Sequence, residues 1–129
     1  RDLVRSRGLG DVYKRQLAGG GLCRVADLRV DVRVHITLPT WPQLDSRPVD
    51  ERERWESIEG AIREHEYAHR DLTVAGARAL AESLDGRETR GCRALRQVVR
   101  SQLSVHGAKI REAHAELDRT TPPRLPIGG

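Results

Sequence analysis

A long amphipathic pattern between residues 50 and 84 constrains this chain more than any other feature. Apolar side chains and two histidines recur at i, i+3 and i+4 spacing, the periodicity of one face of an α-helix. Asp50 is suited to cap this helix, and Glu53 completes a capping-box-like pattern. The sequence therefore predicts a helix over about 51–84 with one apolar stripe. The stripe consists of Trp55, Ile58, Ala61, Ile62, His65, Ala68, His69, Leu72, Ala75, Ala79 and Leu80.

Within this stripe, His65-Glu66-Tyr67-Ala68-His69 forms an H-E-x-x-H motif. Residues four apart share one face of a helix, so both imidazoles can bind the same metal ion. Zinc is the usual metal at such sites, and the glutamate is then the general base for the attacking water. We therefore expect His65 and His69 to be zinc ligands and Glu66 to be the catalytic base of a metallopeptidase. The alternative is that both histidines are hydrogen-bonded core residues.

The segment 28–38 alternates between apolar and polar residues. That period of two is typical of a half-buried β-strand. Pro39 and Pro42 follow, and proline cannot continue a hydrogen-bonded ladder. Because a lone strand is unstable, we expect partner strands either in a lost upstream segment or in another chain.

A second helical pattern covers about 91–117, after a polar turn at 85–91. A short connection favours an antiparallel hairpin of the two helices. With the turn centred near residue 88, His69 is expected opposite His106, and His65 opposite Ile110. The predicted fold class is α+β, with the strand 28–38 packed on an antiparallel hairpin of two long helices.

A catalytic zinc site takes three protein ligands, and the motif supplies two. His106 is the preferred third ligand because it lies in the apolar stripe of the second helix. Its alternative role is core packing or a buried hydrogen bond. His114 is offset from that stripe and is expected to be more exposed, while Glu116 and Asp118 are weaker candidates. Asp71 points about 200° around the helix from His69.

The first 16 residues resemble a translated sequencing adapter. The run from Arg7 to Gln16 corresponds to a transposase-type adapter residue for residue. We therefore treat 1–16 as an adapter-derived scar, 17–121 as an N-terminally truncated domain and 122–129 as an irregular tail. A signal peptide is presumed lost upstream. The alternative is a genuine basic arm.

The charge balance changes when these residues are set apart. The chain has 23 basic and 19 acidic residues, a net charge of +4. Residues 1–16 hold five of the basic and two of the acidic residues, so the rest carries +1. Arginines on the helices are interspersed with acidic residues, as on a solvated surface. A nucleic-acid-binding hairpin thus loses its main support, and no apolar run reaches the length of about 18 residues expected of a transmembrane helix.

The H-E-x-x-H motif stands within a longer series of distinctive residues. In order, these are Cys23, Ile36-Thr37-Leu38-Pro39-Thr40-Trp41, Trp55, the H-E-x-x-H motif, Cys92 and Leu117-Asp118-Arg119-Thr120-Thr121. This series resembles the bacterial domain of unknown function 922 family, described as predicted secreted zinc-dependent proteases. The resemblance covers about 23–121. It departs after the Asp-x-x-Thr region, where members often have a His-Gly pair and this chain has Pro122-Pro123-Arg124.

The resemblance implies an α+β domain with a disulfide between Cys23 and Cys92, a zinc cofactor, a peptide or protein substrate, and a periplasmic or secreted location. Two cysteines also suit one bridge in an oxidising compartment, whereas free thiols would suit a reduced cytosol. The free edge of the strand 28–38 is a candidate site for an extended peptide. The alternative function is a non-catalytic, disulfide-stapled periplasmic or envelope domain whose zinc is structural or absent.

Overall fold

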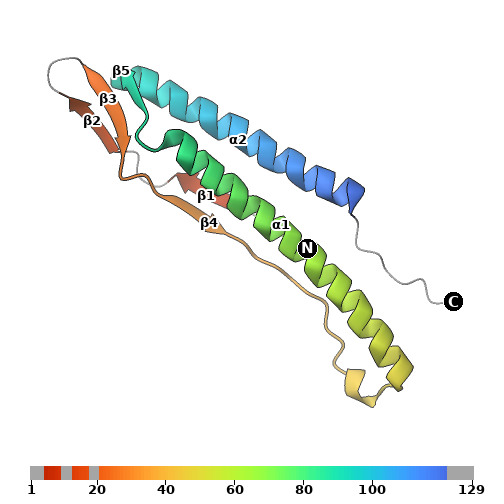
Figure 1. Cartoon of the computed structure of the whole chain (residues 1–129). Coiled ribbons are helices and arrows are strands. Elements are labelled where there is room, and N and C mark those ends of the chain that lie inside the picture. The colour runs from red at the N-terminus through yellow and green to blue at the C-terminus, as the bar shows by residue number, and fades with distance from the viewer. Residues whose placement is uncertain (1–4, 10–12, 18–20, 122–129) are drawn as a thin grey trace.

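A computed structural model of the chain describes residues 5–9, 13–17 and 21–121. Two long helices, α1 (Val49–Leu84) and α2 (Cys92–Thr120), run antiparallel and form the body of an elongated molecule (Figure 1). Short strands lie along α1 and around the end of the hairpin. The predicted α+β fold is confirmed. The strands are β1 (Arg5–Leu9), β2 (Tyr13–Leu17), β3 (Leu22–Ala26), β4 (Val30–Arg33) and β5 (Glu88–Arg90).

The predicted alternation along 28–38 is confirmed by burial, because its apolar positions are half-buried and the residues between them are exposed. Ladder pairing is shorter than predicted and covers Val30–Arg33, where β4 pairs antiparallel with β1 up to Arg5↔Arg33. Beyond β4 the chain continues along α1 (Figure 1) to a 3₁₀ helix, η1 (Leu44–Ser46). The partner strand β1 thus lies among the residues interpreted as adapter-derived, whereas the predicted tail at 122–129 lies outside the described residues.

β3 is the central strand of the second sheet, which has the order β2-β3-β5 and antiparallel pairing throughout. Its partner β5 belongs to the connection between the helices, which the sequence predicted to be a polar turn. A disulfide joins Cys23 of β3 to Cys92, the first residue of α2, with a Cα–Cα distance of 5.0 Å. The disulfide that the family resemblance implied is therefore present, and it fastens α2 to the sheet.

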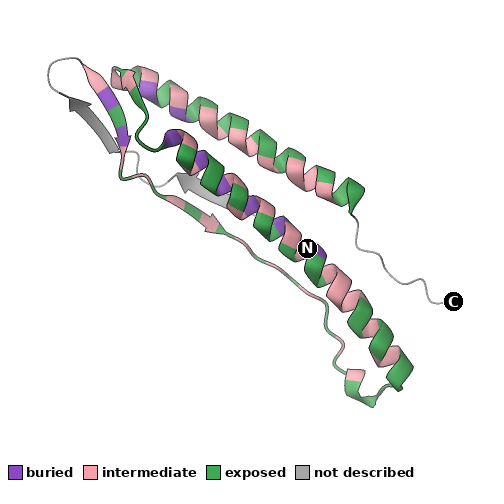
Figure 2. Cartoon of the chain, viewed as in Figure 1, coloured by how far each residue is buried: buried purple, intermediate pink, exposed green. Residues whose placement is uncertain are grey.

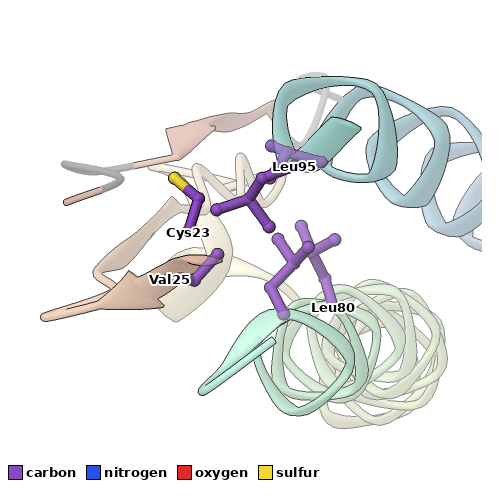
Figure 3. Packing of buried hydrophobic residues seen from close by; sticks show 6 residues of the cluster. Cys23, Val25, Leu80 and Leu95 are labelled. Carbon is purple, nitrogen blue, oxygen red and sulfur yellow. The ribbon is translucent and has the colours of Figure 1, made fainter. Parts of the chain in front are cut away.

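The hydrophobic core lies at the sheet end of the hairpin, between β3 and the two helices. Side chains from all three elements point toward one another there (Figure 3). Buried residues continue down the facing side of α1, whereas the far end of the molecule is more exposed (Figure 2). Neither helix contains an apolar stretch long enough to cross a bilayer. The core consists of Cys23, Val25, Leu80, Leu84, Leu95 and Val99.

Close approach of the two helices beyond this core is set by a glycine. A Cβ atom placed on Gly76 of α1 would lie 2.3 Å from Cγ1 and 2.6 Å from Cδ1 of Ile110 on α2. Such distances are well inside ordinary van der Waals contact, so a side chain at this position would displace Ile110 or the helix that carries it. Gly76 therefore fixes the helix spacing between the core and the histidines.

Candidate metal centre

His65 and His69 lie one turn apart on the inner face of α1, as the i, i+4 spacing predicts. Both side chains are 6% exposed. Their rings meet edge to face with centroids 4.8 Å apart, and their Nε2 atoms are separated by 3.2 Å. The two imidazoles therefore present the same nitrogen to a shared point between α1 and α2.

Asp118, in the last turn of α2, supplies the third polar group at this point. Its Oδ1 atom lies 2.8 Å from His65 Nε2 and 2.8 Å from His69 Nε2. The three side chains form a group whose candidate ligand atoms all lie within 4.8 Å of one another. The Asp118 side chain is 39% exposed, so this group is open to solvent on the side of α2.

The chemistry of this donor set fits zinc. Two imidazole nitrogens and one carboxylate oxygen are common zinc ligands. Nitrogens bound tetrahedrally to zinc at about 2.0–2.1 Å are separated by roughly 3.3 Å, and the two Nε2 atoms here are 3.2 Å apart.

A second layer of contacts surrounds His69. Its Nδ1 atom lies 2.6 Å from Nδ1 of His114, and the two rings stack with centroids 4.8 Å apart. The other nitrogen of His114, Nε2, lies 3.0 Å from Oγ1 of Thr73. Thr73 is 1% exposed and donates its hydroxyl to the backbone carbonyl of His69 over 3.2 Å.

The structure does not bring His106, the preferred third ligand, into the described metal-binding group. His69 lies opposite His114 instead. His114 is eight residues beyond His106 on α2, which is about 12 Å along the helix axis. The predicted register assumed a turn centred near residue 88. Instead the connection is extended and pairs with β3, so α2 begins beyond the end of α1 (Figure 1).

His114 and Asp118 had a signal in the sequence that the prediction did not use. They are themselves four residues apart on α2, the same spacing as His65 and His69 on α1. In an antiparallel hairpin, two such pairs meet as one cluster when the register matches. His114, predicted to be more exposed, is half-buried against α1.

Residues 8–123 match the model of a family described as bacterial protein of unknown function (DUF922). The chain belongs to this family. The match includes the H-E-x-x-H motif, both cysteines and Asp118. No curated protein and no solved structure matches the chain. The family resemblance inferred from the sequence is thus confirmed.

Proposed function

We propose that this DUF922 chain is a zinc-dependent metallopeptidase, with the metal held by His65, His69 and Asp118. The observation that carries the proposal is the convergence of two Nε2 atoms and one carboxylate oxygen next to the glutamate of an H-E-x-x-H motif. When bound, zinc supplies Lewis-acid chemistry: it polarises the peptide carbonyl and makes water a better nucleophile at neutral pH.

The number and exposure of the donors support a catalytic site over a closed structural one. A structural zinc is enclosed by four protein ligands, whereas a catalytic site keeps a position open for water or substrate. The described group has three members, and the Asp118 side chain leaves it accessible from solvent. The two histidines are buried, so one side of the site is enclosed and the other is open.

Glu66 is the group that moves protons in this proposal. It is half-buried and directly follows the metal ligand His65 on α1. A carboxylate held at this place accepts a proton from the attacking water and delivers it to the leaving amine. Glu66 transfers protons and does not bind the metal, whereas the two histidines bind the metal. Loss of the Glu66 carboxylate should therefore stop hydrolysis without removing zinc.

The H-E-x-x-H motif itself supports a peptide as the substrate class, because two histidines four residues apart on a helix with the intervening glutamate are the signature of zinc metalloproteases. The disulfide fits an oxidising compartment, and we propose that the peptidase works in the periplasm or outside the cell.

The test compares zinc content and hydrolysis in the full chain and two variants. The parent is expected to bind about one zinc per chain and to cleave a fluorescence-quenched peptide library. His65→Ala should lose both properties, whereas Glu66→Gln should keep the zinc and lose hydrolysis. A folded parent without zinc contradicts the proposal. A parent that binds zinc but cleaves no peptide supports the non-catalytic, disulfide-stapled domain instead.

A further inference from the structure

His69 differs from His65 in the support of its second ring nitrogen. Nδ1 of His69 is 2.6 Å from His114, whereas the described residues offer no hydrogen-bond partner to Nδ1 of His65. We propose that His114 and Thr73 are positioning residues that hold His69 in the tautomer that binds metal. This inference rests on the proposed metal site and concerns how the chain prepares one of its ligands.

The first step follows from the orientation of the His69 ring. Its Nε2 atom faces Asp118 and His65, so Nε2 must be the unprotonated nitrogen when a metal is bound. A neutral imidazole then carries its proton on Nδ1. That N–H points at Nδ1 of His114, 2.6 Å away, which must therefore act as an acceptor.

The second step fixes the tautomer of His114. With its Nδ1 accepting, neutral His114 carries its proton on Nε2, 3.0 Å from Thr73 Oγ1. Thr73 Oγ1 accepts the hydrogen bond from this N–H and donates its own hydroxyl hydrogen to the carbonyl oxygen of His69. The three donors are His69 Nδ1, His114 Nε2 and Thr73 Oγ1, and each has one acceptor. The arrangement therefore forms with both histidines neutral.

The opposite direction would block the metal. If His114 donated from Nδ1, then His69 would accept there and carry its proton on Nε2, facing Asp118. Thr73 decides between the two directions because its single hydroxyl hydrogen can go either to the His69 carbonyl or to His114 Nε2. The carbonyl contact supports the direction that leaves Nε2 of His69 available to a metal.

Burial makes these contacts matter. Thr73 and His69 are both buried, so water does not readily replace a lost hydrogen-bond partner. The hydrogen bonds from His69 through His114 to Thr73 form a relay. Thr73 is one helical turn from His69, so α1 supplies both the proposed ligand and the last residue of this relay. Loss of a residue that hydrogen-bonds a metal ligand in this way typically weakens metal binding about 10–100-fold.

The direct test is nitrogen-15 NMR of the histidine rings in the zinc-loaded full chain. We expect His69 to carry its proton on Nδ1 and His114 to carry its proton on Nε2. A proton on Nδ1 of His114, or a doubly protonated His114 ring, overturns the proposal. This readout uses the parent protein, so it does not depend on the folding of any variant.

Zinc affinity, measured by chelator competition, provides a second test. His114→Phe and Thr73→Val remove the relay groups while keeping much of their shape, and each should weaken binding about 10–100-fold. His114→Asn keeps an acceptor near the position of Nδ1 and Thr73→Ser keeps the hydroxyl, so both should bind within a few-fold of the parent. Parent-like affinity in the Phe and Val variants overturns the relay alone. A parent that binds no zinc overturns the proposed function and the relay together.

Discussion

His69 and Asp118 are 49 residues apart in the chain, yet Nε2 of the histidine and Oδ1 of the aspartate are separated by 2.8 Å. The contact joins the middle of α1 to the C-terminal part of α2. A metal at this point would therefore bind across the hairpin rather than to one helix. The site consequently depends on the register and spacing of the helices as well as on the H-E-x-x-H motif.

Replacing Asp118 tests whether the third ligand comes from α2. We expect Asp118→Asn to weaken zinc binding by more than about 100-fold, because the loss of an outer partner alone costs about 10–100-fold. The neutral amide also removes the negative charge opposite two imidazoles. Chelator competition measures the affinity, and circular dichroism checks that both helices remain.

His106→Phe is the matched control for Asp118→Asn. His106 is a half-buried histidine of the same helix that lies outside the described cluster, so its replacement should leave zinc affinity within a few-fold of the parent. If His106→Phe loses zinc and Asp118→Asn retains it, the third ligand is His106, as the sequence predicted. The observed hairpin register would then not be the one that binds the metal.

The local elements of this fold follow from patterns within short stretches of sequence. The stripe through His65 and His69 predicted α1 and its inward face, and the alternation along 28–38 predicted the half-buried strand. Both patterns arise from the geometry of a single element. Each pattern can be read from the sequence because the buried face of a helix recurs at every turn and that of a strand at every second residue.

The hairpin register required information that no local pattern contains. Whether 85–91 forms a tight turn or an extended segment depends on β3, which lies more than 60 residues earlier and pairs with β5. That pairing moves the start of α2 beyond the end of α1 and brings His114, rather than His106, to His69. The proposed third ligand, Asp118, was thus hidden by a long-range contact, although its i, i+4 spacing from His114 was visible.

Gly76→Ala tests the dependence of the site on helix spacing. The added methyl group would collide with Ile110, and overpacking of this kind costs about 1–3 kcal/mol. The better helix propensity of alanine offsets up to about 1 kcal/mol of this cost. We therefore expect a net loss of unfolding free energy in urea denaturation, together with weaker zinc binding.

Gly60→Ala separates this steric effect from helix propensity. Gly60 lies on the same helix, and a Cβ atom there would meet nothing within 4 Å. This variant should gain about 0.5–1 kcal/mol in unfolding free energy and keep the zinc affinity of the parent. Equal stabilisation by both substitutions would contradict the close approach of α1 and α2 at Gly76.

Trp41 and Trp55 connect the extended chain after β4 to the first part of α1. Their ring centroids lie 5.8 Å apart at an angle of 73°, and the Arg47 guanidinium lies over the Trp41 ring. An edge-to-face pair is stabilised by about 0.5–1.5 kcal/mol beyond its buried area. We expect Trp41→Ala to lower the unfolding free energy by roughly 1–2 kcal/mol while leaving the disulfide intact. Unchanged fluorescence of Trp55 in this variant would contradict the contact.

The disulfide and the metal site should stabilise the same hairpin from separate places. Cys23 and Cys92 close a loop across 69 positions of sequence at the sheet end, whereas the proposed metal ligands lie further along both helices. Loop closure of this length is expected to contribute about 4 kcal/mol through the unfolded chain. Cys23→Ser combined with Cys92→Ser should lower the unfolding free energy by about that amount, and thermal unfolding with and without reductant measures the effect in the parent.

Zinc should compensate for much of this loss. A ligand that binds the folded chain alone stabilises it by about 2.7 kcal/mol at a concentration 100 times its Kd. The double serine variant should therefore show the same zinc-induced increase in unfolding free energy as the parent, because neither cysteine contacts the metal-binding group. Calorimetric melts of both proteins at matched multiples of Kd provide the comparison. A zinc-induced increase that vanishes with the disulfide would show that the hairpin register itself is lost when α2 is released from the sheet.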